Sequence, residues 1–398
     1  MSDSLMPVYN RAPLAVERGE GAWLHDTNGV AYLDCVAGIA TDALGHAHPR
    51  LIAALTEQAT KIWHVSNIFR IPGQEALAQR LTEACFADVV FFGNSGSEAV
   101  ECALKAARRY HSVAGAPERI DVIGFAGSFH GRTYAAINAA GNPSYVEGFG
   151  PPLPGYAQLM IDDEAGIAAA IARPTTAALI VEPVQGEGGA RALSGAWLQR
   201  VRRLCSEAGV LLIHDEVQSG MGRTGRLFAH QWYEDAAPDI MCLAKALGGG
   251  FPVAACLATR EAARGMTAGV HGSTFGGNPL AMAVAIAAFD EISKPETLAH
   301  ACAVSADLFE RLAALATRYP DVIADVRGKG MLIGLKLIPN NRDFMVLARD
   351  QRLLVAGGGE NCVRLLPPLT LTFDEAAEAV ARLEAACAEA RGRLAQAA

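Results

Sequence analysis

The sequence predicts an α/β fold built on a mostly parallel sheet, and two observations lead to this prediction. From about residue 75, long helical stretches alternate with short runs of β-branched residues, which is the pattern of strands joined by helices. Several of these runs are apolar on both faces, as expected for strands that helices cover on each side. After about residue 290 the alternation gives way to helices around two strand-like segments, which predicts a smaller α+β domain.

The expected elements follow in order along the chain. Two strand-like pieces, 21–24 and 31–34, flank the turn signal Thr27-Asn28-Gly29, and the stretch 49–63 predicts an amphipathic helix. The later strands are expected at 89–92, 121–125, 178–181, 210–213, 240–243, 253–257, 326–335 and 363–366. We therefore divide the chain into an N-terminal segment, 1–70, that joins a small domain, a large domain, 71–290, and a C-terminal small domain, 291–398.

Composition excludes several classes of protein. A formal charge of −8 and a pI near 5.7 argue against nucleic acid or anionic membrane as the main partner, because both demand a basic surface. The longest apolar stretch, Leu280–Phe289, is too short to span a bilayer and predicts a buried helix. The first residues, Met1-Ser2-Asp3-Ser4, show no basic region before an apolar core, so we expect no secretory signal and a cytoplasmic protein.

Cysteine and histidine usage predicts neither disulfides nor a metal site. The nine cysteines are scattered singly without a CxxC pair, which favours reduced, buried thiols. His46-Ala47-His48 is the only close histidine pair, and no Cys, Asp or Glu cluster completes a ligand set around it. We expect a turn-and-cap role for this pair before Pro49.

Lys245 is the most informative residue of the chain. It ends the apolar run 240–244, and the run 210–213 ends similarly at His214, Asp215 and Glu216. An acid and an amine at the ends of two such strands can converge on one ligand at the carboxyl edge of a parallel sheet. A carboxylate for a pyridinium nitrogen and a lysine for an aldehyde are what pyridoxal 5'-phosphate (PLP) requires. We expect His214 to be a hydrogen-bonded or orienting histidine rather than a base.

A possible phosphate site follows the strand at 89–92. The turn Gly93–Glu98 (GNSGSE) opens a helix expected over 99–110, and a helix N-terminus with free N–H groups and nearby hydroxyls suits a phosphate. The same residues are equally typical of a plain helix cap, with Ser95 or Ser97 capping and Glu98 in the first turn. The turn is neither a Walker loop nor a GxGxxG dinucleotide turn.

Four further loops carry chemistry-bearing side chains. In the loop 127–132, Phe129 is suited to stack on a flat ring and Arg132 to clamp a carboxylate, although a plain polar loop explains both residues too. Glu182 and Glu187 lie in a glycine-rich loop after another strand, and Arg364 has apolar neighbours that leave its head group over a pocket. The fourth loop, 271–279, is glycine-rich and carries two hydroxyls.

Together these segments resemble the class III (ornithine/acetylornithine type) PLP-dependent aminotransferases of fold type I. The resemblance runs over nearly the whole chain in order and rests on eight motifs: LGHAHP (44–49), NSGSEA (94–99), GSFHGR (127–132), EPVQGEGG (182–189), HDEVQSGMGRTG (214–225), KALGGGFP (245–252), HGSTFGGNP (271–279) and RLLPPLT (364–370). Within the family, the compact length and the combination of Arg132, Glu187 and Arg364 look most like the acetylornithine aminotransferases. The fold implied has a seven-stranded, mostly parallel sheet.

The family pattern also implies residue roles. Lys245 is the Schiff-base lysine and the proton-transferring base, and Asp215 pairs with the ring nitrogen. The other cofactor-binding positions implied are Gln218 at the ring hydroxyl, Val217 and Phe129 on the two ring faces, Gly96 and Ser97 at the phosphate, and Thr274 reaching that phosphate from a partner subunit. The substrate-binding positions implied are Arg132 at the α-carboxylate of the donor, Ser273 beside Thr274, Tyr9, and the pair Glu187 and Arg364.

The resemblance implies that a homodimer transfers an amino group from N2-acetyl-L-ornithine to 2-oxoglutarate, a step of arginine biosynthesis. Ornithine, succinylornithine, succinyldiaminopimelate and 4-aminobutyrate remain alternative donors, because pocket shape rather than the motifs decides among them. From other classes, an NAD-dependent oxidoreductase is disfavoured by the absence of GxGxxG, and a PLP-fold binding module by the presence of Lys245 and Asp215.

Overall fold

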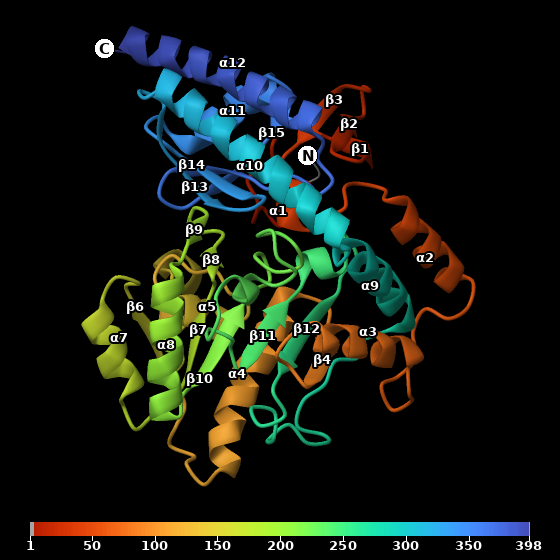
Figure 1. Cartoon of the computed structure of the whole chain (residues 1–398), viewed down its shortest axis with the longest axis vertical. Coiled ribbons are helices and arrows are strands. Elements are labelled where there is room, and N and C mark those ends of the chain that lie inside the picture. Colours follow the sequence, from red (N-terminus) through yellow and green to blue (C-terminus); the bar gives the residue numbers. More distant parts are fainter. Residues whose placement is uncertain (1–3, 398) are drawn as a thin grey trace.

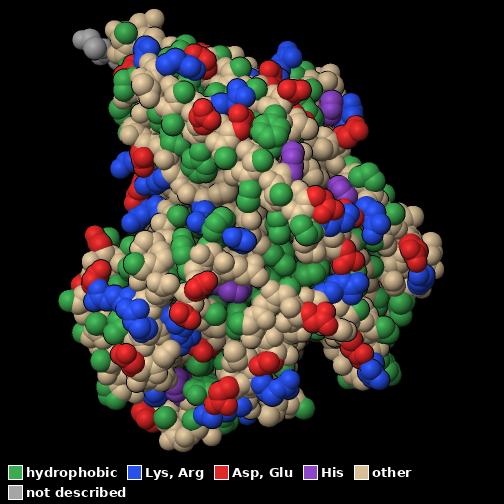
Figure 2. All heavy atoms as spheres, viewed as in Figure 1, with side chains coloured by type: hydrophobic (Ala, Val, Ile, Leu, Met, Phe, Trp, Pro, Cys, Tyr) green, Lys and Arg blue, Asp and Glu red, His purple; other side chains and the backbone are tan. Residues whose placement is uncertain are grey.

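The computed structural model describes residues 4–397. Met1–Asp3, which contribute to the expectation of no secretory signal, lie outside the described residues. One half of the molecule is built around a large sheet, and segments from both ends of the chain, red and blue in Figure 1, form the other half. In the described part of the chain, no helix is both long and apolar enough to cross a membrane. Acidic and basic side chains are interspersed over the face drawn in Figure 2.

The large sheet has seven strands, which confirms the predicted α/β class and the sheet implied by the family resemblance. Its order is β4-β12-β11-β10-β7-β5-β6, and only β12 runs antiparallel to its neighbours. The strands are β4 (Val89–Gly93), β5 (Asp121–Phe125), β6 (Tyr156–Leu159), β7 (Thr176–Val181), β10 (Leu211–Asp215), β11 (Ile240–Leu243) and β12 (Ala254–Ala258). The central strands β7, β10 and β11 are buried along their whole length, as their continuous apolar runs predict.

Helices and short elements surround this sheet. They are α3 (Pro72–Glu83), α4 (Gly96–Val113), α5 (Tyr134–Ala140), α6 (Pro143–Val146), α7 (Glu164–Ile171), α8 (Gly195–Ala208), α9 (Pro279–Ile292), the 3-10 turns η1 (Ala229–Trp232) and η2 (Lys245–Leu247), and the hairpin β8 (Val184–Gln185) and β9 (Arg191–Ala192). Helix α9 is mostly buried, which confirms the prediction for the run 280–289. Helix α4 packs on the sheet through alanine and cysteine side chains, whose small size lets the helix approach closely.

The other half combines the two ends of the chain. One sheet has the order β1-β2-β3-β15 and a second has the order β13-β14-β17-β16, so Leu33 of β3 pairs with Leu353 of β15. The elements are β1 (Val16–Glu20), β2 (Trp23–Asp26), β3 (Ala31–Asp34), α1 (Ala37–Ala40), α2 (Pro49–Ala59), α10 (Pro295–Arg318), β13 (Ile323–Lys329), β14 (Leu332–Leu337), α11 (Asn341–Asp350), β15 (Leu353–Leu354), β16 (Ala356–Gly358), β17 (Cys362–Leu365) and α12 (Phe373–Ala397).

Several elements differ from the sequence predictions. The expected helix 49–63 ends four residues early, the expected strand 326–335 is a hairpin of β13 and β14, and β6 was not predicted. The turn-and-cap role of the histidine pair is confirmed for the backbone, because His48 is the N-cap residue of α2 and follows a turn at Ala47, but its side chain makes no cap hydrogen bond. His46 Nε2 lies 2.8 Å from Asp34 Oδ2. Helix α2 packs against α9 of the large half. The domain boundaries at 70 and 290 stay a prediction.

Candidate active site

The candidate site lies where parallel strands of the large sheet end. The ends of β4, β5, β7, β10 and β11 and the segments after them contribute residues that line one cavity of about 330 Å³: 94–97, 129–132, Glu182, Glu187, Asp215, Val217, Gln218, Ala244 and Lys245. Because the carboxyl ends of parallel strands meet at one edge, residues far apart in sequence converge there, as the sequence predicts.

Lys245 stands at the start of the turn that follows β11. Its φ of 46° lies in the left-handed region that side chains rarely adopt, and the tight turn continues with a 3.0 Å hydrogen bond from Gly248 N to Lys245 O. Burial lowers the pKa of the Lys245 amine to about 8, while the negative charge of Glu187 opposes this shift. The amine is therefore much more readily available in its neutral, nucleophilic form than that of an exposed lysine.

Asp215 ends β10 as a carboxylate that is 3% exposed. Its Oδ2 lies 2.7 Å from His130 Nδ1, and its Oδ1 accepts a 3.0 Å hydrogen bond from Val217 N. Burial alone would lower the pKa of His130, but the hydrogen bond and the charge of Asp215 together raise it above its ordinary value. Sequence analysis recognised Asp215 but missed His130, whose only signal is its place directly after Phe129.

Glu182 is a second buried acid that sequence analysis left without a role. Its two carboxylate oxygens accept hydrogen bonds from Phe129 N at 2.8 Å and from Gly186 N at 3.0 Å. The side chain thus ties the loop of Phe129 to the loop that carries Glu187. Burial raises the pKa of Glu182 to about 7.

The turn after β4 is both a helix cap and a wall of the cavity. Ser95 is the N-cap of α4, with Glu98 N donating to Ser95 Oγ at 3.4 Å and the Glu98 carboxylate accepting from Ser95 N at 2.8 Å. At Gly96, a Cβ atom would lie only 2.8 Å from Val217 Cγ1. The Gly96 backbone therefore lies close to Val217, which follows β10 and lines the same cavity. The N–H groups of Gly96 and Ser97 begin the helix and have no partner within it.

Arg364 pairs with Glu187, which lines the cavity, but Arg364 itself is not among the residues that line it, so its head group does not lie directly over the pocket, contrary to the sequence prediction. Arg364, from β17, is 1% exposed, and its Nη2 lies 2.8 Å from Glu187 Oε1. The same guanidinium donates from Nη1 to Gln218 Oε1 at 3.1 Å and from Nη2 to Gly357 O at 2.7 Å. The three residues Glu187, Gln218 and Arg364, predicted from separate motifs, are therefore in direct contact.

Arg132 also lines the cavity, and its guanidinium lies over the Tyr145 ring. Its guanidinium carbon is 3.8 Å from the centre of the Tyr145 ring and 5.6 Å from that of Phe129, while Arg132 N donates to Ser97 Oγ at 3.2 Å. Arg132 and Tyr145 also line a second cavity, to which Tyr9 belongs. Sequence analysis did not identify Tyr145.

Ser273 and Thr274 do not line the Lys245 cavity within the described part of this chain. Ser273 Oγ instead accepts a 3.1 Å hydrogen bond from Asn94 Nδ2, and Thr274 is exposed. Asn67 Nδ2 donates to the carbonyl oxygens of Ser273 and Gly276 at 3.0 and 2.9 Å, which holds this loop beside the segment 62–69.

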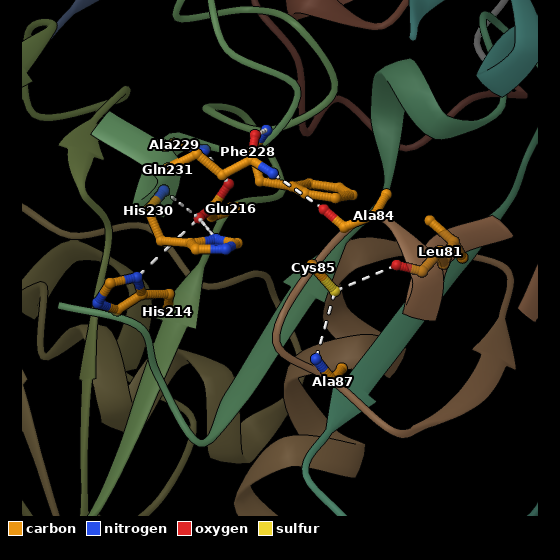
Figure 3. A network of polar contacts seen from close by, with 10 residues as sticks. All are labelled: Leu81, Ala84, Cys85, Ala87, His214, Glu216, Phe228, Ala229, His230 and Gln231. Carbon is orange, nitrogen blue, oxygen red and sulfur yellow. Dashed lines mark hydrogen bonds and ion pairs between the residues drawn. The ribbon is translucent and has the colours of Figure 1, made fainter. Parts of the chain in front are cut away.

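A buried network of polar contacts surrounds Glu216, the residue that follows β10 (Figure 3). Glu216 is 1% exposed, and its carboxylate accepts hydrogen bonds from the N–H groups of Ala229 and His230, the latter at 2.8 Å. The prediction that His214 is hydrogen-bonded is wrong: both its ring nitrogens lack a hydrogen-bond partner among the described residues, and Nδ1 lies 4.0 Å from Glu216 Oε1. Burial lowers the pKa of His214 to about 3, so this ring is neutral.

Between residues 4 and 397, no group of three or more His, Cys, Asp or Glu side chains is arranged to hold a metal ion. All nine cysteines are free thiols.

Comparison with known proteins identifies the family. A profile of the class-III aminotransferases matches residues 6–387. Acetylornithine aminotransferase 2 of Caulobacter vibrioides is 68% identical over 391 residues, which cover 98% of this chain and 96% of that protein. Acetylornithine aminotransferase of Mesorhizobium japonicum is 55% identical over 383 residues, or 96% of this chain and 95% of that protein.

Solved structures give the same result. N-acetylornithine aminotransferase from Stenotrophomonas maltophilia matches with a TM-score of 0.85 and 38% identity, covering 97% of this chain and 98% of that one. An amine transaminase from an uncultivated Pseudomonas species, in its PLP-bound form, matches with a TM-score of 0.89 and 32% identity over 98% of this chain and 99% of that one. The NAD-dependent oxidoreductase is thereby set aside, and the chain belongs to the class-III aminotransferases.

Proposed function

We propose that this aminotransferase uses PLP to transfer the δ-amino group of N2-acetyl-L-ornithine to 2-oxoglutarate, giving N-acetyl-L-glutamate 5-semialdehyde and L-glutamate, as a step of arginine biosynthesis. The observation that carries this proposal is the composition of the Lys245 cavity. It is lined by a lysine of lowered pKa, a buried carboxylate and Glu187, and Glu187 pairs with Arg364, which is buried and does not itself line the cavity. The names of the relatives from Caulobacter vibrioides and Mesorhizobium japonicum support the choice of donor.

The residues of the cavity fit PLP. The free N–H groups of Gly96 and Ser97 at the start of α4 suit a phosphate, and Phe129 and Val217 line the cavity as apolar walls for a flat ring. Asp215 suits a protonated ring nitrogen, because its charge is already stabilised by His130 and by the Val217 N–H group. When bound, PLP supplies an electron-withdrawing ring that makes the hydrogen on the amine-bearing carbon acidic.

Each remaining role falls to a side chain of this protein. Lys245 Nζ holds the cofactor in the resting enzyme, then acts as the base that moves a proton from the amine-bearing carbon. Asp215 would keep a proton on the ring nitrogen, and Gln218 would bind the ring hydroxyl. Glu182 keeps the Phe129 loop in position through the Phe129 N–H group.

The Glu187–Arg364 pair explains how one site accepts two different acids. An acetylated donor brings a single carboxylate, and the Arg132 guanidinium, which lies over Tyr145 and pairs with no carboxylate among the described residues, is suited to bind it, so Arg364 stays paired with Glu187. 2-Oxoglutarate brings a second carboxylate, which takes the place of Glu187 on Arg364. Glu187 is suited to move because its side chain is 31% exposed, whereas Arg364 is held by Gln218 and Gly357.

We also propose that the active unit is a homodimer with a site at each subunit interface. Large apolar side chains are exposed around the 271–279 loop: Trp63, Ile68, Phe69 and Phe275 are 65%, 82%, 61% and 60% exposed. Apolar surface of this kind is typical of protein–protein interfaces. Two-fold symmetry would bring Thr274 and Ser273 of each chain to the opposite cavity, where a hydroxyl adds to the phosphate site.

A complementation assay tests the dimer. Lys245→Ala and Thr274→Trp chains are each inactive by this proposal, because the tryptophan blocks the neighbouring site. In a mixed dimer, one site carries both substitutions and the other site carries neither. Each heterodimer should therefore have up to one active site. If subunit exchange is demonstrated and no activity returns, Thr274 does not serve the partner.

Substrate choice is tested by presenting a panel of amino donors with 2-oxoglutarate. N2-acetylornithine should give the highest kcat/KM, ahead of ornithine, succinylornithine, succinyldiaminopimelate and 4-aminobutyrate. A higher kcat/KM for any of these four compounds would show that it, and not N2-acetylornithine, is the preferred donor. We infer a cytoplasmic location from the nine free thiols, which suit a reducing compartment.

A further inference from the structure

Arg223 is a buried arginine that the proposed chemistry does not use. It lies on the segment after β10, its side chain is 1% exposed, and it does not line the Lys245 cavity. Its Nε and Nη2 atoms lack a hydrogen-bond partner among the described residues. Burial lowers the pKa of the Arg223 guanidinium to about 9, although the negative charge of Asp42 opposes this shift. Because burying a cation with unpaired donors is costly, stability is a poor explanation for an arginine at this position.

The contacts that Arg223 does make join the two halves of the molecule. Its Nη1 donates to Met331 O at 3.2 Å and to Pro367 O, and Met331 N donates back to Arg223 O at 2.9 Å. Met331 lies in the turn between β13 and β14, and Pro367 follows β17, so these contacts reach the half formed by the two chain ends. The backbones touch at the same place, since a Cβ atom at Gly330 would lie 2.5 Å from the carbonyl carbon of Thr224.

Arg223 and Arg364 belong to one closed ring of contacts. Arg364 precedes Pro367 on the segment that leaves β17, and its Nη1 donates to Gln218 Oε1 at 3.1 Å. Gln218 and Arg223 lie on one segment, 216–223, which backbone hydrogen bonds fold into consecutive turns. The two segments are therefore connected twice, from Arg223 to Pro367 and from Arg364 to Gln218. A shift of Pro367 would change the position of Arg364 relative to Gln218.

We propose that Arg223 is a positioning residue for the exchange of carboxylates at Arg364. By fixing Pro367 against the large half, it holds the Arg364 guanidinium where the second carboxylate of 2-oxoglutarate replaces Glu187. A substrate with one carboxylate leaves Arg364 paired with Glu187 and depends less on this position. The inference rests on the proposed two-substrate switch and names a residue that aligns it.

Arg223→Met tests the inference, because methionine keeps a long, unbranched side chain and removes the hydrogen bonds to Met331 O and Pro367 O. The segment 366–369 keeps its place in the fold through two backbone hydrogen bonds of 2.7 Å, which its N–H groups donate to the carbonyl oxygens of Cys35 and Ala43. Urea titration measures the folding of each variant. Arg223→Lys, which keeps the charge on a shorter side chain, replaces the methionine variant if that variant does not fold.

The matched control is Arg202→Met. Arg202 Nη1 donates to Asp239 Oδ2 at 2.8 Å and to Ala237 O at 3.4 Å, so it makes comparable contacts inside the large half alone, and it does not line the Lys245 cavity. Its loss should lower the free energy of unfolding without changing the choice between substrates.

Two measurements on the cofactor-loaded enzyme separate ligands with one carboxylate from ligands with two. The first is kcat/KM of the half-reactions with 2-oxoglutarate and with N2-acetylornithine. The second is calorimetric binding of glutarate, which has two carboxylates, against pentanoate, which has one. Arg223→Met should lower the 2-oxoglutarate value and the glutarate affinity by roughly tenfold, because a small displacement of a binding group is costly. Values for acetylornithine and pentanoate should change less than about twofold, as should every value for the control.

The double variant of Arg223→Met with Arg364→Ala shows whether Arg223 acts through Arg364. If it does, the double variant should bind glutarate as weakly as Arg364→Ala alone, because the two losses are not additive. Additive losses, or the absence of a selective loss in Arg223→Met, would overturn the inference and leave the proposed function standing. If Arg364→Ala alone spares both glutarate and 2-oxoglutarate, the proposed switch fails and the role of Arg223 fails with it. If wild type does not use acetylornithine, the proposed donor is wrong, and the comparison of glutarate with pentanoate still decides the role of Arg223.

Discussion

The charge on Glu187 offers the sharpest test of how this site discriminates between its two substrates. Glu187→Gln keeps the size of the side chain and removes only the charge that neutralises Arg364, whose Nη2 lies 2.8 Å away. Arg364 itself stays in position, because Gln218 Oε1 and Gly357 O accept its other hydrogens at 3.1 and 2.7 Å. The variant therefore presents an unpaired, buried guanidinium to whichever donor enters.

The magnitude follows from a single charge-assisted hydrogen bond. Such a bond contributes about 1.5–3 kcal/mol, which corresponds to roughly 10–150-fold in rate. Glutamate, which brings a second carboxylate, should no longer have to displace Glu187, so the lower part of this range is expected as its gain. Acetylornithine should lose by a similar factor, because its chain now lies beside an unpaired cation. Arg364→Ala should mainly slow the half-reaction with 2-oxoglutarate.

The assay follows the two half-reactions separately by the absorbance of the cofactor, with acetylornithine and with glutamate as donors. Glu360→Gln is the matched control, since Glu360 pairs with Arg191 and Arg327 at 2.9 and 2.7 Å and does not line the Lys245 cavity. The control should change neither rate by more than about twofold. Equal losses in both half-reactions for Glu187→Gln and for Arg364→Ala would refute the switch.

Three further predictions concern the cofactor and the helix that begins at the site. The purified enzyme should be yellow, and borohydride should attach the cofactor to it covalently. Lys245→Ala should abolish both this attachment and transamination. Covalent attachment of the cofactor to the variant would disprove the assignment of Lys245 as the residue that binds PLP. In apoenzyme, the rate of covalent PLP attachment should rise as the pH rises through about 8, because only the neutral Lys245 amine reacts. Glu187→Gln should move the midpoint of this rise to lower pH, because the substitution removes a negative charge that raises the Lys245 pKa. Ser95→Ala should lower the free energy of unfolding of apoenzyme by about 1 kcal/mol through loss of the α4 cap, as measured by urea titration; an unchanged value would mean that the cap contributes nothing.

The main sheet could be predicted because most of its strands have a recognisable local sequence pattern. Continuous apolar runs mark the buried strands, and helices of regular period separate them. Two features escaped for physical reasons. Strand β6, Tyr156–Leu159, is short and partly polar at the sheet edge, so it lacks the buried pattern. The antiparallel direction of β12 could not be read either, because a buried strand has the same composition in both directions.

The candidate site was predictable wherever a motif follows a strand directly, as Asp215 follows β10 and Lys245 follows β11. Hydrogen-bond partners that come together only in the folded structure could not be predicted. His130 meets Asp215 across 85 positions, and Glu182 joins two loops through backbone N–H groups that no sequence pattern reveals. His214 shows the converse error, because its acidic neighbour suggested a hydrogen bond that the geometry does not make.

The buried charges of the site constrain one another, and this explains why Lys245 is surrounded by so many acids yet keeps a lowered pKa. Asp215 is matched by His130, and Glu182 has a pKa of about 7, so neither adds a full uncompensated negative charge. Glu187 raises the pKa of Lys245, whereas Arg364 lowers it, and while the two are paired their effects oppose each other. Burial is then left as the largest influence on the amine. In the proposed switch, the second carboxylate of 2-oxoglutarate would replace Glu187 on Arg364 and keep the guanidinium neutralised, so the second substrate would enter without leaving an unpaired cation beside Lys245.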